Sequence, residues 1–231
     1  MITKLDKEKH KYVMLAILLD IYRDFDLGTS FVFKWWTACY FLYNLDRFST
    51  DLDFDFVGEI SEQTILEKLK KIVQKYWEIR DFYNKRNTFF LMLSYWEIDH
   101  NIKIEISKRI TLSKYERIHF NGMDILVQNK SSIFANKLYA LTNRTSIANR
   151  DLYDIYFFFR NLWDIDEPLL ESLTGMKTKD YFKKVIDFIE KLGENYNILN
   201  WLWELIDSKQ KTFVKEKLLN ELIWYIKFRT H

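Results

Sequence analysis

Residues 51–57, DLDFDFV, constrain the fold of this chain more than any other segment, because apolar and acidic side chains alternate almost throughout. Successive side chains of a β-strand point to opposite faces. Leu52, Phe54 and Phe56 therefore share one face, and the three aspartates share the other. The pattern predicts a strand that packs its apolar face on a core and presents carboxylates on the opposite face.

The remaining sequence indicates helices around a small sheet. Only five glycines and one proline occur among 231 residues, which disfavours an all-β sandwich with its many turns. The formal net charge of +2 excludes nucleic-acid binding by bulk charge alone, so such binding requires a local patch. The single cysteine, Cys39, forms neither an internal disulfide nor a zinc site and fits a reducing cytosol.

Hydrophobic periodicity predicts two consecutive regions. The first region, 1–128, combines helices at 5–25, 37–43 and 60–77 with strands at 31–33, 51–57, 88–98 and 101–108. We expect Gly28 to end the first helix, Ser61 to cap the third, and Asp99, His100 and Asn101 to form a hairpin turn. The second region, 129–231, is helical at 131–142, 148–163, 178–192 and 212–228. The fold class is α+β, and the charged N-terminal segment is neither a signal peptide nor a membrane span, which predicts a cytoplasmic protein.

The aspartates of 51–57 are candidate metal ligands. Asp51 and Asp53 point to the same side of the strand, and two converging carboxylates repel each other unless a cation neutralises them. Magnesium takes oxygen ligands, often together with nucleotide phosphates, and two-metal phosphoryl transfer needs such a platform. The plainer interpretation is the solvated face of an edge strand. Asp55 continues the row, but a third position often lies beyond a shared site.

The context of these aspartates resembles a known family. The run FK-x-x-TA-x-x-x-LY-x-L-DRFS-x-DLDFD, residues 33–55, is similar to the first motif of the AbiEii/AbiGii toxin nucleotidyltransferases, relatives of the polymerase-β-like superfamily. In that motif a strand enters a glycine-containing turn that opens a helix, and Arg-x-Ser precedes an Asp-x-Asp strand. The resemblance implies a nucleotidyltransferase domain with a small mixed sheet, followed by a helical region that completes the active site and packs on that domain.

A second segment, NKLYALTNRTSIANRDLYDIYFFF at 136–159, resembles a later motif of the same family. The matching positions are Lys137, Ala140, Arg144, Arg150, Asp151 and Asp154. Between the two motifs, KIEIS at 103–107 is similar to the third central strand of the family. The motifs keep their order and spacing, so the resemblance covers residues 10–160.

The resemblance implies roles for individual residues. Asp51 and Asp53 would hold two Mg²⁺ ions that bridge the phosphates of an NTP, with Glu105 as a candidate third carboxylate. Lys137 would reach the triphosphate, and Asp151 would act as base or metal ligand. The other implied substrate-binding residues are Thr37, Arg47, Ser49, Arg150 and Asp154.

Each assignment has a structural alternative. Lys137 fits a solvated helix position, as most lysines do. Asp151 and Asp154 fit charges near a helix N-terminus, with Arg144 and Arg150 as their ion-pair partners.

The sequence departs from the family at Trp35 and Trp36, where the turn has Gly-Gly or Gly-Ser. Glycine suits positive φ and lets backbone N–H groups approach phosphate at a helix N-terminus. The two indoles would block the phosphate site, point away from it, stack on a base, or pack into the core. The alternatives are therefore an active enzyme and an impaired one.

The function implied by the resemblance is transfer of a nucleotide from an NTP to RNA, at the 3′ end of tRNA, by the toxin of a toxin–antitoxin or phage-defence pair. The partners would be NTP, RNA and a cognate antitoxin. The alternative is a nucleotidyltransferase-fold binding protein without activity. The C-terminal lysines could face RNA, but the polar sides of ordinary helices explain them equally: Lys179, Lys183, Lys184, Lys211, Lys215 and Lys217.

Overall fold

The computed structural model describes residues 4–94, 101–193 and 196–230. The chain divides into two compact units. The sheet unit comprises Met1–Asn44 and Phe48–Gln128, and the helical unit comprises Leu45–Arg47 and Asn129–His231. The mixed α/β architecture followed by C-terminal helices confirms the expected fold class.

The sheet unit is built on a mixed sheet with the strand order β3-β4-β5-β2-β1-β7-β6. Its strands are β1 (Phe31–Phe33), β2 (Asp51–Phe56), β3 (Glu78–Lys85), β4 (Thr88–Ser94), β5 (Asn101–Ser107), β6 (Tyr115–Phe120) and β7 (Met123–Gln128). Strand β2, the acidic segment of the sequence, is central: it pairs antiparallel with β1 and parallel with β5. The edge-strand interpretation of this segment is therefore wrong.

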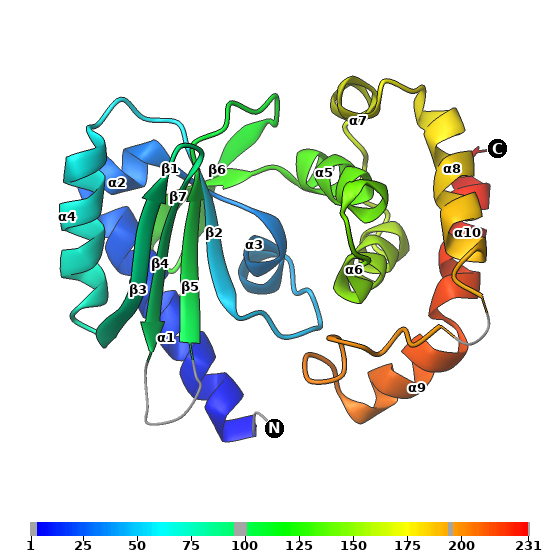
Figure 1. Ribbon diagram of the computed structural model, residues 1–231, viewed down its shortest axis with the longest axis horizontal. Coiled ribbons are helices and arrows are strands. Elements are labelled where there is room, and N and C mark those ends of the chain that lie inside the picture. The colour runs from blue at the N-terminus through cyan, green and yellow to red at the C-terminus, as the bar shows by residue number, and fades with distance from the viewer. Residues whose placement is uncertain (1–3, 95–100, 194–195, 231) are drawn as a thin grey trace. The chain divides into compact units, whose positions relative to one another are not determined.

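Helices cover one face of this sheet (Figure 1). They are α1 (Lys4–Arg23), α2 (Phe25–Ser30) and α4 (Glu62–Val73), whereas α3 (Trp35–Leu42) follows β1 directly and lies beside β2. Apolar residues of α1 and α4 form one core with Leu52 and Phe54 of β2 and with Ile104 and Ile106 of β5. Because side chains alternate along a strand, Asp51 and Asp53 point to the opposite face of the sheet.

Several local predictions are confirmed and others are wrong. Ser61 caps α4 as expected, since its hydroxyl accepts a hydrogen bond from the Thr64 N–H. Gly28 does not end the first helix: α1 ends at Arg23, and Asp24 caps α2, which contains Gly28. The expected turn at Asp99 and His100 lies outside the described residues, although β4 and β5 pair antiparallel.

The sequence analysis did not predict strands β3, β6 and β7. A tight turn joins β6 to β7, with positive φ at Asn121 (47°) and Gly122 (78°). Asn-Gly is the dipeptide that favours two-residue hairpin turns of this kind, so the sequence did contain a signal for the hairpin.

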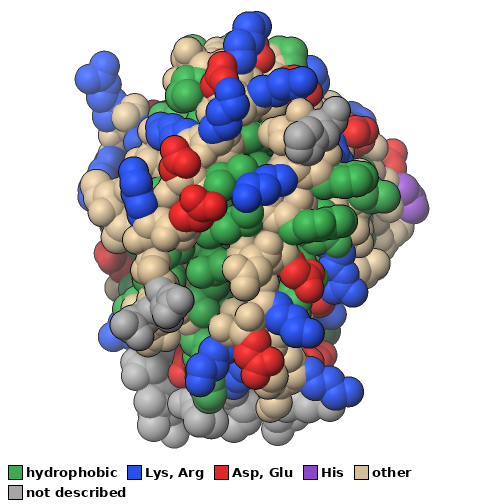
Figure 2. All heavy atoms as spheres, turned by 90° about the vertical axis from the view of Figure 1, so that its right-hand side faces the viewer, with side chains coloured by type: hydrophobic (Ala, Val, Ile, Leu, Met, Phe, Trp, Pro, Cys, Tyr) green, Lys and Arg blue, Asp and Glu red, His purple; other side chains and the backbone are tan. Residues whose placement is uncertain are grey.

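The helical unit consists of α5 (Lys130–Asn143), α6 (Asn149–Arg160), α7 (Glu167–Thr174), α8 (Thr178–Glu190), α9 (Ser208–Glu216) and α10 (Leu218–Thr230). The helix expected at 212–228 is two helices, and α7 was not predicted, although Pro168 stands in its first turn and Asp166 caps it. On the face shown in Figure 2, lysine and arginine side chains are interspersed with acidic ones. This face therefore lacks the continuous basic surface that RNA binding would favour. In the described part of the chain no helix is both long and apolar enough to cross a membrane.

Candidate functional site

The acidic face of β2 is the first part of the candidate site. Asp51 and Asp53 lie two residues apart on this central strand, and the Asp53 residue is only 4% exposed. The parallel register places Lys103 beside Asp51 and Glu105 beside Asp53, on the same face of the sheet. Three carboxylates and a lysine thus share two adjacent strands.

Asp55, the last aspartate of the row, has a different environment. Its carboxylate lies 2.6 Å from the Nζ of Lys34, and both side chains are almost completely buried. Removing one member of such a pair would leave an uncompensated buried charge. Asp55 therefore secures the junction of β1, β2 and α3, and Lys34 is a site residue to which the sequence analysis gave no role.

The turn between β1 and α3 keeps a backbone conformation that suits glycine. Trp35 begins α3 with a φ of 62°, in the left-handed region that side chains with a Cβ rarely adopt. Its half-buried indole contacts the Trp36 ring at a centroid distance of 5.1 Å and lies 4.4 Å from Lys34 Nζ. Trp36 is buried, with 6% exposed. Both indoles thus have packing partners within the sheet unit.

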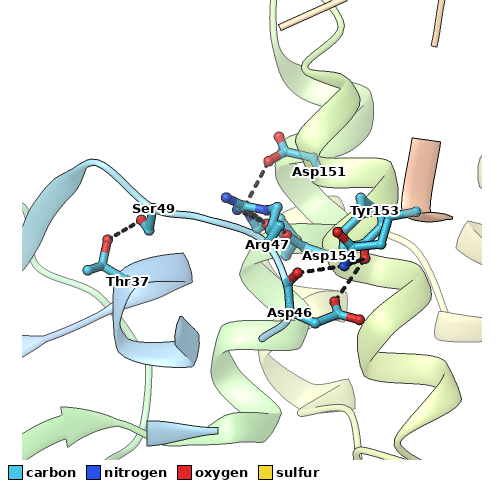
Figure 3. A network of polar contacts seen from close by, with 9 residues as sticks. Thr37, Asp46, Arg47, Ser49, Asp151, Tyr153 and Asp154 are labelled. Atoms are coloured by element: carbon cyan, nitrogen blue, oxygen red, sulfur yellow. Dashed lines mark hydrogen bonds and ion pairs between the residues drawn. The ribbon is translucent and has the colours of Figure 1, made fainter. Parts of the chain in front are cut away.

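Thr37 and Ser49 attach the start of α3 to the start of β2. The two hydroxyl oxygens are 2.6 Å apart (Figure 3). The Thr37 hydroxyl also donates to the backbone carbonyl of Asp51. The Lys34 N–H donates to the Asp53 carbonyl at 3.0 Å. These contacts give Thr37 and Ser49 a positioning role, because they fix Asp51 relative to the first turn of α3.

In the helical unit, Arg47 and Lys137 bind the two aspartates of α6. Arg47 donates through Nε and Nη2 to both carboxylate oxygens of Asp154, at 2.5 and 2.7 Å (Figure 3). Lys137 Nζ lies 2.8 Å from Asp151 and 3.0 Å from Asp154. The interpretation of Lys137 as a solvated lysine is therefore wrong, since its side chain is 3% exposed and doubly paired.

Electrostatics favour the charged form of Asp154. Burial alone would raise the pKa of Asp154, but the charges of Arg47 and Lys137 outweigh it and keep that pKa below its usual value. Arg144 lies at the margin of the group, with its Nε 3.1 Å from Asp151. The expected ion pairing of Arg144 is thus observed with Asp151, whereas Asp154 pairs with Arg47 and Lys137.

A hydrogen-bonded chain supports the same group from the adjoining segment. The Tyr153 hydroxyl donates to the Asp46 carboxylate at 2.8 Å, and the Gln210 amide donates to the Asp46 carbonyl and to the Tyr153 oxygen. These contacts fix residue 46, and hence the neighbouring Arg47, on α6 and α9. Arg150 lies in the first turn of α6.

The donor set on β2 fits magnesium in its usual protein environment. Mg²⁺ is commonly held by one or two carboxylates together with substrate phosphates and water. Asp51 and Asp53 supply such a pair. Across the described ranges, no group of three or more His, Cys, Asp or Glu side chains is placed to hold a metal ion.

The mixed sheet with paired carboxylates on its central strand is a nucleotidyltransferase fold. Known structures with the same fold resemble this chain along its whole length. The crystal structure of JHP933 from Helicobacter pylori is 22% identical and superimposes with a TM-score of 0.60, covering 100% of this chain and 97% of that chain. A second H. pylori structure, described as a candidate nucleotidyltransferase, is 22% identical with a TM-score of 0.58 and 99% coverage of both chains. At this identity the likeness establishes the fold alone.

The family is established by the sequence. The family model described as the nucleotidyl transferase AbiEii toxin of type IV toxin–antitoxin systems matches residues 17–192, and the chain belongs to this family. Comparison with curated proteins gives no match.

Proposed function

We propose that this chain is a metal-dependent nucleotidyltransferase that acts as the toxin of a type IV toxin–antitoxin pair and transfers a nucleotide from an NTP to RNA, at the 3′ end of tRNA. The observation that carries the proposal is the position of Asp51 and Asp53 on central strand β2, next to the first turn of α3. Carboxylates beside a helix N-terminus are what a nucleotide triphosphate and its cations require. NTP and tRNA are cytoplasmic, and a cognate antitoxin is the expected protein partner.

In the proposed reaction an RNA hydroxyl attacks the α-phosphate of the NTP in line, and pyrophosphate leaves. Two Mg²⁺ ions, when bound, would stabilise the charge that develops on the transferred phosphate. Asp51 and Asp53 would hold these ions, with Glu105 as a third carboxylate beside them. Thr37 and Ser49 would keep Asp51 fixed during the reaction.

The helical unit would contribute cationic and acidic groups. Lys137, held between Asp151 and Asp154, would carry positive charge to the triphosphate, and Arg47 and Arg150 would assist in phosphate binding. Asp151 would serve as base or metal ligand. Asp154 would orient Arg47 and Lys137, which agrees with its bidentate contact to Arg47.

A second candidate function is that of a nucleotidyltransferase-fold binding protein without transfer activity. It is favoured by one observation, the pair Trp35 and Trp36 at the first turn of α3. Their indoles add bulk where backbone N–H groups would otherwise approach phosphate closely.

The test is label transfer from each radioactive NTP to total bacterial tRNA in Mg²⁺, beside the double variant Trp35→Gly, Trp36→Gly. Asp53→Ala is the blank for both forms, and Asp124→Ala, which changes an exposed aspartate of β7, is the matched control. Transfer that is lost with Asp53→Ala and kept with Asp124→Ala supports the enzyme.

The other two outcomes also distinguish the enzyme from the binding protein. Transfer by the glycine form alone shows a competent carboxylate platform behind a blocked phosphate turn. No transfer by either form would refute the tRNA-modifying enzyme and favour the binding protein.

A further inference from the structure

Two aromatic side chains extend the carboxylate row of β2 across the sheet. The strand registers pair Asp53 with Glu105, Glu105 with Phe90, and Phe90 with Tyr83. Directly paired residues share a face, so these four side chains form one row on the face opposite the α1 and α4 core. The row runs from the central strand to the edge strand β3.

The aromatic end of this row is a stacked pair. The rings of Tyr83 and Phe90 are nearly parallel, at an interplanar angle of 8° and a centroid distance of 4.5 Å. Phe90 thus covers one side of the Tyr83 ring, and the Lys85 ammonium lies 4.3 Å from the centroid of that ring. Phe90 is half-buried, and its neighbour on the other side is β5, the strand of Glu105. A further planar group that joined the stack on that side would lie over Glu105, whose exposed side chain would have to turn aside.

We propose that Phe90 and Tyr83 form a stacking platform for the terminal unpaired base of the RNA acceptor. The inference rests on the proposed nucleotidyl transfer and names the part of the sheet unit that would hold its acceptor. Aromatic side chains beside basic residues are the usual means by which proteins hold single-stranded nucleic acid, because every base has a π-face.

Charge and distance on this face suit an RNA end. Lys103 and Lys85, both exposed, lie in the rows on either side of the platform and can meet the phosphates of the acceptor. Two strand spacings, roughly 10 Å, separate Phe90 from Asp53. A nucleotide stacked on Phe90 can therefore direct its sugar hydroxyls toward the carboxylates.

The strand order favours the acceptor base over the base of the NTP. The turn that would hold the triphosphate leads from β1 into α3, and β1 lies on one side of β2. The strands β5, β4 and β3 lie on the other side. The platform is thus across the carboxylates from the triphosphate turn, where an attacking hydroxyl would enter for in-line displacement.

The experiment measures binding of a labelled hairpin RNA with unpaired 3′ nucleotides by fluorescence anisotropy, with Mg²⁺ and without NTP. We expect Phe90→Leu to weaken binding roughly 5- to 150-fold, the loss of one stacked base. Phe90→Tyr should bind as the unchanged chain does. Phe25→Leu, which alters an 81% exposed aromatic of α2, is the matched control and should have no effect.

An RNA that lacks only its 3′-terminal base makes the test specific. The unchanged chain should bind this shortened RNA as weakly as Phe90→Leu binds the intact RNA. Phe90→Leu should bind the shortened RNA no more weakly than the unchanged chain does. Equal binding of both RNAs, additive losses, or no measurable RNA binding would overturn the platform.

Kinetics separate this inference from the proposed function. If the chain transfers label but Phe90→Leu leaves the KM for RNA unchanged, the platform is wrong and the function stands. If only the KM for NTP rises, the platform holds the incoming base and the assignment to the acceptor is wrong. Base-dependent RNA binding without any transfer would refute the enzyme and leave the platform intact.

Discussion

Asp154→Asn tests whether the ion group of the helical unit is as buried and as mutually dependent as its geometry implies. The substitution keeps the size of the side chain and removes its charge. Arg47, whose side chain is 1% exposed, would then lose the carboxylate that accepts hydrogen bonds from its Nε and Nη2. Lys137 would lose its ion pair with Asp154 and keep the one with Asp151.

The expected loss of folding stability follows from the Arg47 charge that stays buried without its carboxylate partner. Breaking a buried ion pair by removing one partner costs about 3–5 kcal/mol, because the other charge is left without compensation. With a urea m-value of about 2 kcal/mol per molar, the unfolding midpoint should fall by roughly 1.5–2.5 M. The matched control is Asp180→Asn, because Asp180 pairs with Lys183 on α8 where the two side chains are 57% and 74% exposed. Exposed pairs contribute about 0–1 kcal/mol, so this variant should hardly move the midpoint.

Urea unfolding followed by far-UV circular dichroism supplies the measurement. The double variant Arg47→Met, Asp154→Leu should lose less stability than the two single changes lose in sum. It removes both charges of the Arg47–Asp154 pair, whereas each single change leaves the other charge of that pair behind. If Asp154→Asn costs no more than Asp180→Asn, the ion group is solvated and the reasoning about Arg47 and Lys137 fails.

Two further predictions concern the turn and acid stability. Trp35→Gly should be about 1 kcal/mol more stable to urea than Trp35→Ala, because both lose the indole and only glycine relieves the φ of 62°; equal stabilities would show that the turn stores no strain. The stabilisation from the depressed pKa of Asp154 should be fully present above about pH 4 and lost as the pH falls through its lower folded-state pKa. Urea midpoints between about pH 2 and 5 should therefore depend less on pH in Asp154→Asn, and equal slopes would contradict the assignment.

Local patterns in the sequence were sufficient to predict the carboxylate strand. The alternation of Leu52, Phe54 and Phe56 with three aspartates determines which side chains share a face, since the strand period is two. Likewise, the Ser61 hydroxyl bonds to Thr64 only three residues away, so the N-cap of α4 could be predicted from local sequence. Short-range geometry of this kind is encoded within a few neighbouring residues.

The partners of those carboxylates could not be predicted in the same way. The pairing of Asp53 with Glu105 joins residues that are far apart in sequence, and the Glu105–Phe90 pair depends on the register of β4 against β5. Strand order and register arise from packing of the whole sheet, which periodicity alone does not specify. The stacked pair Tyr83 and Phe90 was missed for this reason, because β3 itself was not predicted.

The helical unit shows a second limit of local patterns. Arg47 stands in the first motif and Asp154 in the second, and their bidentate contact links residues 107 positions apart. The family resemblance marked both residues as substrate-binding candidates but did not reveal that they pair. A buried charge needs a partner, yet the sequence does not show which of several carboxylates provides it.

Tryptophan in place of glycine at position 35 could change the path of the backbone or only the access of ligands to the turn. Trp35 retains the left-handed φ of 62°, at a cost of about 1–2 kcal/mol for a residue with a Cβ. The surrounding contacts explain why the turn tolerates this cost: Thr37 bonds to Ser49 and to the Asp51 carbonyl, and the Lys34 N–H bonds to the Asp53 carbonyl. The main chain is thus held in the path that glycine would take, and the indoles change what can approach it. Restoring glycine at positions 35 and 36 should therefore alter access of phosphate to the first turn of α3 while leaving Asp51 and Asp53 where they are, so any gain of transfer in that variant reports on access alone.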